Sequence, residues 1–291
     1  MIILAFSDYL RQAQRLADRL DAPLAEVSLH HFPDSESFIC LPPSLPEHVI
    51  FCRSLNQPND KLIELLLCAT TARELGAKRL TLAAPYLCYM RQDFANQTGV
   101  AVSQRIIGKM LANLFDDVIT VDPHLHRISS LDQAIPIKNA ISLTAADEIG
   151  CFLKQKLEYA LLVGPDSESE QWVANIANKI GFDYCIARKE RGGDKQVAMT
   201  LPEIQFANKT IVIVDDMAST GRTLGMATRL LKAAGSKDIY AVVTHALFCD
   251  DAEAYILQAG INTLWSTDSI DHPTSCIKLD ALLADAIKAI I

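Results

Sequence analysis

The segment Ile211–Leu224, which reads IVIVDDMASTGRTL, combines residue types that could hold a phosphorylated sugar. An apolar run typical of a buried strand is followed by two carboxylates, Asp215 and Asp216. A small, polar loop comes next, and a helix then begins. Loop amides and a helix N-terminus attract phosphate oxygens, while paired carboxylates can accept hydrogen bonds from the vicinal hydroxyls of ribose. The loop residues expected to hold the sugar phosphate are Ser219, Thr220, Gly221, Arg222 and Thr223.

An ordinary capped strand–loop–helix junction is the simpler explanation of this segment, because Ser and Thr are preferred at helix N-caps. Two adjacent acids at a strand end followed by STGRT make that explanation the less favoured one. Ligands of open parallel sheets bind at the carboxyl ends of strands, which is where this junction is expected to lie.

Three other segments place polar residues after apolar runs. In Pro85–Asp93 (PYLCYMRQD), Arg91 offers a planar fork for phosphate or a surface for adenine, and Gln92 offers an amide. His124 follows an aspartate in VDPH, and we favour it over the neighbouring His126. Asp166, in GPD, carries the oxygen ligands that a hard cation prefers.

The segment 211–224 resembles the phosphoribosyl-pyrophosphate-binding loop of the phosphoribosyltransferase fold. One group of enzymes with that fold transfers ribose from phosphoribosyl pyrophosphate to a base. The other makes phosphoribosyl pyrophosphate from ribose 5-phosphate and ATP. The remaining motifs favour the second group. Nearly the whole chain resembles the ribose-phosphate pyrophosphokinase family, and the motifs of that family occur here in the same order.

The resemblance implies where ATP binds. His31–Glu36 (HFPDSE) is similar to a Phe-Pro-Asp-Gly-Glu turn that contacts adenine from a neighbouring subunit, and the RQD of Pro85–Asp93 is similar to a run that helps to bind ATP. The ATP-binding residues implied are Phe32, Asp34, Glu36, Arg91, Gln92 and Asp93.

The resemblance also implies residues for metal and catalysis. His124 would lie beside the ATP phosphates and Mg²⁺, the expected cofactor, and Asp166 would serve the metal. Arg188–Arg191 (RKER) is similar to a Lys-x-Arg pair on a mobile flap. Lys189 and Arg191 would therefore neutralise charge as the β-phosphorus of ATP is attacked.

The sequence departs from the family pattern in three places. Ser35 and Ser167 replace glycines, which could tighten two loops. The segment after Asp93 lacks the family's usual basic or Gly-Glu stretch, so its nucleotide contacts are not carried over. The flap, Arg188–Pro202, is long and matches only at its start, so control by phosphate or ADP is not inferred.

Apolar runs alternate with amphipathic ones along the chain, which predicts an α/β fold. We expect two phosphoribosyltransferase-type domains, each with a central parallel sheet flanked by helices. Residues 1–143 would form the ATP-side domain and residues 144–291 the ribose-phosphate-binding domain, with a C-terminal helix over Lys278–Ile291 that could pack on either. The strand ending at Pro85 resembles that ending at Pro165, and Val118–Asp122 resembles Ile211–Asp215, which predicts a duplication with an insertion in the second half.

Composition narrows the functional class. A length of 291 residues suggests two domains, and the net charge of −8 without a basic stripe argues against a nucleic-acid partner. No apolar stretch is long enough for a membrane span and no leader is evident, so a cytoplasmic location is expected. The eight cysteines are scattered without a CxxC pair, which indicates buried, reduced thiols.

The sequence thus predicts a ribose-phosphate diphosphokinase. It would transfer pyrophosphate from ATP to ribose 5-phosphate, giving phosphoribosyl pyrophosphate and AMP, and would act as a homo-oligomer, a dimer or hexamer. Two alternatives remain: a base-using phosphoribosyltransferase, and a non-catalytic regulatory paralogue of the synthetase.

Overall fold

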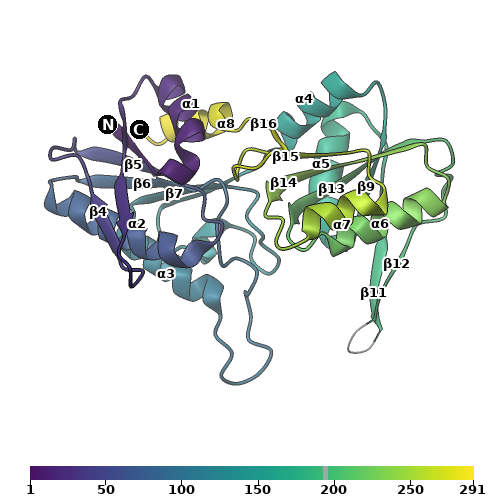
Figure 1. Cartoon of the computed structure of the whole chain (residues 1–291), viewed down its shortest axis with the longest axis horizontal. Helices are drawn as coiled ribbons and strands as arrows, with labels where there is room; N and C mark the ends of the chain where they lie inside the picture. Colours follow the sequence, from purple (N-terminus) through teal and green to yellow (C-terminus); the bar gives the residue numbers. More distant parts are fainter. Residues whose placement is uncertain (193–195) are drawn as a thin grey trace. The chain divides into compact units, whose positions relative to one another are not determined.

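A computed structural model describes residues 1–192 and 196–291 of the chain (Figure 1). The chain divides into two compact units. The first contains residues 1–144 and 279–291, and the second contains residues 145–278. The sequence-based division differs at the C-terminus, because it assigned residues 279–291 to the second domain.

The first unit, all of which is described, is built on a six-stranded sheet whose strands are all parallel. Strands β5 to β7 are buried almost throughout, as expected for a parallel sheet covered on both faces. In spatial order the strands are β2 (Leu24–Glu26), β1 (Ile2–Ala5), β5 (His48–Cys52), β6 (Arg79–Ala83), β7 (Asp117–Val121) and β8 (Asn139–Leu143).

Helices cover both faces of this sheet (Figure 1). Helices α2 (Pro58–Glu74) and α3 (Ser103–Leu114) lie on one face, where Leu65 and Leu111 join the core. Helices α1 (Leu10–Leu20) and α8 (Asp280–Lys288) pack against each other on the opposite face.

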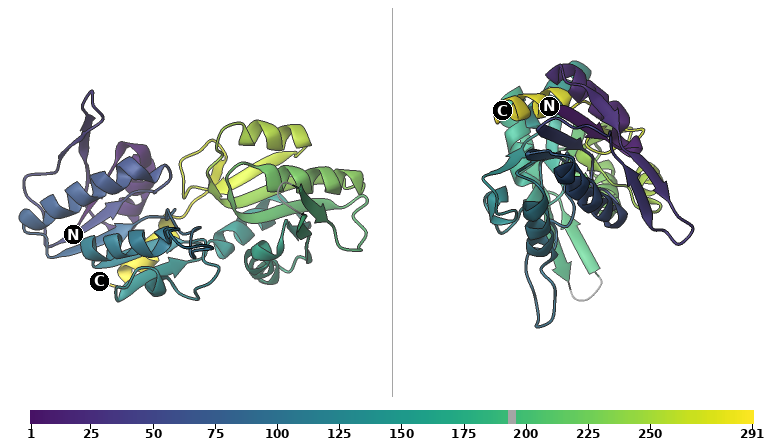
Figure 2. Two further views of the ribbon diagram at one scale, coloured as in Figure 1. Left: turned by 90° about the horizontal axis from the view of Figure 1, so that it is seen from below. Right: turned by 90° about the vertical axis from the view of Figure 1, so that its left-hand side faces the viewer.

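A separate two-stranded antiparallel hairpin follows β2 and projects from the sheet (Figure 2). Its strands are β3 (Ser28–His31) and β4 (Ser37–Cys40). The turn between them, Phe32–Glu36, carries three of the predicted ATP-binding residues.

The described part of the second unit has the same kind of sheet, again with all strands parallel. In spatial order the strands are β10 (Tyr184–Ile186), β9 (Leu161–Gly164), β13 (Thr210–Ala218), β14 (Asp238–Ala246), β15 (Thr263–Thr267) and β16 (Ser275–Ile277). An antiparallel hairpin of β11 (Arg188–Gly192) and β12 (Gln196–Thr200) follows β10.

Two pairs of helices cover the second sheet. Helices α6 (Arg222–Ala233) and α7 (Ala252–Ala259) pack together, and Leu224, Leu231 and Ile256 join the core on their side. Helices α4 (Ala146–Lys156) and α5 (Glu170–Ile180) pack together, and α5 contacts β9 and β13.

The two sheets share one topology. In each, the first strand of the unit lies second in spatial order, the second strand forms the edge, and a hairpin precedes the third strand. A duplication was therefore predicted correctly, but the strands were matched wrongly. Strand β6, which precedes Pro85, corresponds to β14 rather than β9, and β7 corresponds to β15 rather than β13. The predicted insertion in the second half is also wrong. The hairpin β11–β12, which lies in that segment, has a counterpart in the first unit, the hairpin β3–β4.

The α/β fold with parallel sheets and flanking helices is confirmed. Apolar spacing predicts helices over Asn59–Leu75 and Ser103–Leu114 and strands over Val49–Cys52 and Val118–Val121, where the structure has α2, α3, β5 and β7. Several elements were not predicted, because they are short or mixed in polarity: the hairpin strands β3, β4, β11 and β12, the strands β2, β8, β15 and β16, and helix α7.

Two smaller expectations have separate outcomes. Burial was predicted for the cysteines, yet Cys40, Cys151, Cys249 and Cys276 are exposed. Among the described residues, no helix is both long enough and apolar enough to cross a bilayer.

The C-terminal helix is fixed to the first unit by a buried carboxylate. Asp280, which is 6% exposed, accepts a hydrogen bond of 2.9 Å from Nε of Arg19 and one of 3.4 Å from Nε of Arg15. Both arginines belong to α1, so Asp280 joins the two ends of the chain.

We expect Asp280→Ala to lower the free energy of unfolding by about 1–2 kcal/mol, because it removes charge-assisted hydrogen bonds to arginines that are themselves partly exposed. The midpoint of urea unfolding measures this change. Asp285→Ala, an exposed position on the same helix, is the matched control. Equal midpoints for the two variants would contradict the assignment.

Candidate functional site

The acid pair of the second unit lies within a strand rather than after it. Strand β13 was expected to end at Val214, but it runs to Ala218, because Met217 and Ala218 continue the pairing with His245 and Ala246 of β14. Asp216 is 4% exposed and Asp215 is half-buried. The backbone amide of Asp216 donates a 3.0 Å hydrogen bond to Oδ1 of Asp215. Both carboxylates are therefore held by regular backbone at the carboxyl edge of the sheet.

The loop after β13 turns sharply at Gly221. This residue has φ +69° and lies immediately before α6. A Cβ atom here would lie 2.9 Å from the carbonyl oxygen of Ala252 and 2.8 Å from Cδ1 of Ile256. Both the backbone angle and the close approach of α7 therefore require glycine.

Backbone hydrogen bonds fasten this loop to the connection between β14 and α7. The amide of Cys249 donates to the carbonyl of Ser219 at 2.9 Å, and the amide of Phe248 donates to Ala218 at the same distance. Ser219 is half-buried and Thr220 is exposed, and both precede the N-cap residue of α6, Gly221. The hydroxyl of Ser219 lies 3.7 Å from Sγ of Cys249.

Arg222 is directed toward α7. Its guanidinium lies 4.1 Å above the ring of Tyr255, and Nη2 is 3.3 Å from Oδ1 of Asp251. The side chain of Arg222 therefore already has partners within the protein. Its backbone amide lies in the first turn of α6, where amides have no acceptor within the helix.

Lys189 brings three of the predicted motifs together. It lies on β11, and its Nζ donates a 3.2 Å hydrogen bond to Oγ1 of Thr223 in the first turn of α6. The same Nζ lies 3.6 Å from Oδ2 of Asp166. The flap lysine therefore lies between the GPD aspartate and the STGRT loop, a location that no single motif specified.

Asp166 caps the short helix that follows β9. Its Oδ1 accepts hydrogen bonds from the amides of Glu168 at 3.1 Å and Ser169 at 3.3 Å. Its Oδ2 faces Lys189. Ser167, which replaces a glycine of the family pattern, has no positive φ, so this replacement imposes no backbone strain.

Negative charge accumulates at this edge of the sheet. Burial raises the pKa of Asp215 well above its ordinary value, and the neighbouring carboxylates of Asp216 and Asp166 raise it further. A group of three acids with one nearby lysine favours a ligand that brings positive charge or hydroxyl donors. A hard cation together with a sugar would meet both conditions.

Arg191 lies on the same strand as Lys189, and its backbone pairs with Val197. Its side chain, and residues 193–195 of the flap, lie outside the described part of the structure. The predicted catalytic role of Arg191 therefore stays a prediction.

In the first unit, the turn Phe32–Glu36 closes the β3–β4 hairpin. The amide of Phe32 donates to the carbonyl of Glu36 at 2.8 Å, and Oδ1 of Asp34 accepts from the Glu36 amide at 3.2 Å. The Phe32 ring is 45% exposed and meets the ring of His30 edge-on, with centroids 5.4 Å apart. Ser35 has φ +73°, so its replacement of glycine strains the backbone.

The RQD segment has one exposed and one buried end. Arg91 and Gln92 are exposed, and Nε2 of Gln92 donates to the carbonyl of Phe94 at 2.7 Å. The side chain of Asp93 is 2% exposed and pairs at 2.6 Å with Nη1 of Arg127. The Arg127 guanidinium also lies 3.8 Å above the Phe94 ring. Asp93 therefore fastens this segment to the one that follows VDPH.

The two histidines after β7 face each other. The rings of His124 and His126 are nearly perpendicular with centroids 3.9 Å apart, and their Nε2 atoms are in contact. Asp122, two residues before His124, is buried and has φ +38°, an uncommon angle that often marks functional loops. Because the two imidazoles adjoin, our preference for His124 over His126 stays a prediction.

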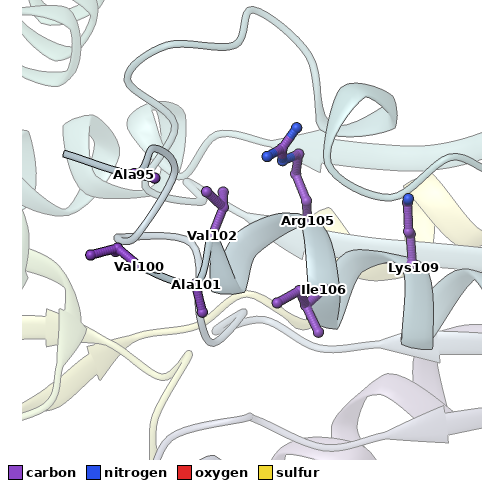
Figure 3. A pocket seen from close by; sticks show the side chains of 7 residues that line it. All are labelled: Ala95, Val100, Ala101, Val102, Arg105, Ile106 and Lys109. Atoms are coloured by element: carbon purple, nitrogen blue, oxygen red, sulfur yellow. The ribbon is translucent and has the colours of Figure 1, made fainter. Parts of the chain in front are cut away.

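A pocket of about 490 Å³ opens where the sequence departs most from the family pattern. Val100, Val102 and Ile106 supply its apolar lining, while Arg105 and Lys109 lie one turn apart on α3 (Figure 3). The amide of Gln104 donates to the carbonyl of Gln92, so the start of α3 is joined directly to the RQD segment.

Each unit thus gathers its own set of predicted residues. The second unit brings Asp166, Lys189, Asp215, Asp216 and Thr223 to one sheet edge. In the first unit, Asp93 and the histidine segment are linked through Arg127. Sequence reasoning missed Arg127 because nothing in its surroundings marks it, and only the 2.6 Å pair reveals its partner.

This fold and this loop define a protein of the phosphoribosyltransferase type. Residues 141–260 match the phosphoribosyl transferase domain, and residues 1–114 match the N-terminal domain of ribose phosphate pyrophosphokinase. The chain belongs to the ribose-phosphate pyrophosphokinase family.

Full-length relatives support this membership. The ribose-phosphate pyrophosphokinase of Methanopyrus kandleri is 32% identical over 99% of this chain and 99% of its own length. That of Saccharolobus solfataricus is 33% identical over 93% of this chain and 94% of its own. The crystal structure of phosphoribosylpyrophosphate synthetase from Mycobacterium smegmatis, at 22% identity, covers 99% of this chain and 98% of its own with a TM-score of 0.83, which shows the shared fold.

We expect Asp215→Asn to raise the melting temperature of the ligand-free protein at neutral pH, by ~2–4 °C for each kcal/mol gained. The pKa of Asp215 is raised in the folded state, so its ionisation lowers stability as the pH rises from its ordinary value through the raised one. The advantage of Asn should therefore vanish below about pH 4. Glu203→Gln, an exposed neutralisation in the same unit, is the control. Lower stability of Asp215→Asn at neutral pH would contradict this.

We expect Ser35→Gly to increase the free energy of unfolding by about 0.5–1 kcal/mol, because glycine adopts φ +73° without steric cost. Ser28→Gly in β3, where φ is not positive, should instead lower it by about the same amount. Chemical unfolding of both variants tests this difference in sign, and a shift in the same direction for both would refute it.

Proposed function

We propose that the protein is a ribose-phosphate diphosphokinase. It transfers the pyrophosphoryl group of ATP to the 1-hydroxyl of ribose 5-phosphate. The hydroxyl oxygen bonds to the β-phosphorus, the bond between that phosphorus and the oxygen bridging it to the α-phosphorus breaks, AMP leaves, and the hydroxyl proton is released. The observation that carries the proposal is the location of Lys189, between Asp166 and Thr223 beside the acid pair.

The second unit binds the sugar phosphate. Its loop Ser219–Thr223 offers amides and hydroxyls at the N-terminus of α6 to the 5-phosphate. Asp215 and Asp216 accept hydrogen bonds from the ribose 2- and 3-hydroxyls. A sugar bound there lies close to Lys189, because that lysine already donates to Thr223 in the same loop.

Lys189 stabilises the charge that develops during transfer. Its side chain is 25% exposed, and partial exclusion of water strengthens the attraction of its charge for phosphate oxygens. We propose that Arg191 assists from the same strand. Because phosphoryl transfer depends mainly on positioning and charge, no further covalent role for the chain is required.

The first unit binds ATP. Phe32, Asp34 and Glu36 on the hairpin turn hold adenine, and Arg91 and Gln92 are exposed for phosphate and base contacts. Asp93 serves this site indirectly, because its side chain is buried against Arg127. The turn projects on an otherwise exposed hairpin, which supports its action on a neighbouring subunit and hence a homo-oligomer.

Mg²⁺ is the proposed metal. The carboxylates of Asp166 and Asp216 lie close enough to Asp215 to raise its pKa, and a group of three carboxylates fits a hard cation. Asp166 is the proposed metal ligand of the second unit and His124 that of the first, and Mg²⁺ would neutralise the phosphates of ATP. We propose that the enzyme works in the cytoplasm.

The alternative of a non-catalytic regulator draws on the strained Ser35 turn. The location of Lys189, between Asp166 and Thr223, weighs against a regulator. A protein that only binds its ligands does not need a cation that stabilises the transition state.

AMP release from ATP, with and without ribose 5-phosphate and Mg²⁺, tests the proposal. We expect AMP to require both, and Lys189→Ala to lower kcat by about 10²–10³, the size typical of losing one preorganised electrostatic group. Lys237→Ala, at a lysine that is 70% exposed in the same unit, should retain full activity.

Wild-type protein that binds ribose 5-phosphate yet releases no AMP would refute the enzyme assignment and favour the regulatory paralogue. Full activity of Lys189→Ala would refute the role of the flap lysine alone.

A further inference from the structure

Glu64 is a buried carboxylate on α2 that the proposed chemistry does not use. The residue is 1% exposed, and its Oε2 accepts a hydrogen bond from Nη1 of Arg53, which is 4% exposed. Arg53 also lies 3.3 Å from Asp8 and 4.0 Å above the ring of Phe6. A charge this deep requires a charged partner and further hydrogen bonds. Arg53 supplies the partner and leaves the other carboxylate oxygen for a different task.

That second oxygen contacts both strands of the β3–β4 hairpin. Oε1 of Glu64 lies 3.0 Å from Nε2 of His31 and accepts a 3.3 Å hydrogen bond from the hydroxyl of Ser37. His31 and Ser37 are directly opposite in the hairpin register, and they form the last pair before the turn Phe32–Glu36. One oxygen atom from the core of the first unit therefore holds the base of that turn from both sides.

The hairpin has little else to fix its direction. Most of its residues are exposed, and a two-stranded hairpin is only marginally stable alone in water. Ile39 is partly buried against the core of the first unit, but it lies beyond Ser37, on the far side from the turn. The Glu64 contacts are thus the ones placed to set the orientation of the turn.

We propose that Glu64 is a positioning residue for nucleotide binding, which fixes the direction of the turn Phe32–Glu36 through His31 and Ser37. The inference rests on the proposed function, in which that turn binds the adenine of ATP. Glu64 touches no substrate in this role. It acts by keeping the exposed turn in one orientation before the nucleotide arrives, which reduces the ordering cost of binding.

Steady-state kinetics of the full chain test the proposal. Glu64→Gln keeps the shape of the side chain, whereas the double variant His31→Ala/Ser37→Ala removes the hairpin contacts and leaves the buried Glu64–Arg53 pair intact. We expect each to raise the KM for ATP by about tenfold, the size of one charge-assisted hydrogen bond, with kcat and the KM for ribose 5-phosphate within about twofold. Ser28→Ala, at the opposite end of β3, is the matched control and should change none of these values.

Hydrogen exchange of the ligand-free protein provides a second readout that does not depend on catalysis. The backbone amides of Phe32, Asp34, Ser35 and Glu36 should exchange faster in both variants, while those of β5 and β6 keep the wild-type rate. Combining Glu64→Gln with His31→Ala/Ser37→Ala should raise the KM for ATP little beyond either alone, because all three side chains belong to one interaction.

Unchanged exchange in the turn would overturn the positioning role. So would an equal rise in both KM values, or additive effects in the combined variant, because a general loss of stability would produce them. If wild-type protein releases no AMP, the proposed function fails, whereas binding of ATP to the same variants by calorimetry still tests the positioning role. Equal ATP affinities in wild type and variants would then overturn it.

Discussion

The organising constraint of the second unit is negative charge collected at the carboxyl edge of a buried parallel sheet. Regular strand pairing holds Asp215 and Asp216 there, and Asp166 follows the adjacent strand β9. Burial and mutual repulsion raise the pKa of Asp215, so the ligand-free site is electrostatically incomplete. Lys189 supplies one compensating charge from the flap. A magnesium ion and the hydroxyls of ribose would supply the rest, which links substrate binding to relief of this repulsion.

The first unit meets a related constraint in a different way. One of its buried carboxylates, Glu64, is compensated within the protein by Arg53 and therefore needs no ligand. Compensation lets Glu64 serve as a rigid support for the hairpin rather than as a binding group. The contrast separates two roles for acids: Asp215 and Asp216 are proposed to bind the substrate, whereas Glu64 is paired with Arg53 and orients a neighbouring element.

Motifs confined to one segment could be predicted from the sequence, and relations between segments could not. The DDMASTGRT loop was recognisable because its residue types and order reflect local backbone needs, such as the positive φ of Gly221. The contact of Lys189 with Thr223, the pairing of Asp93 with Arg127 and the support of His31 by Glu64 join residues distant in sequence. Strand β13 was predicted too short, because two acids interrupt its apolar pattern while pairing with β14 continues.

The repeated topology explains why both units place functional residues on hairpins. In each, the hairpin follows the edge strand and precedes the third strand of the sheet, and most residues of the hairpin in the first unit are exposed. An element of this kind can carry a side chain toward a ligand without disturbing the core. In the second unit it carries Lys189 to the STGRT loop of the same unit. In the first it carries Phe32 outward, where an exposed aromatic ring suits a nucleotide base. The same hairpin, present in both units, therefore carries the proposed charge for transfer in one and the proposed surface for adenine in the other.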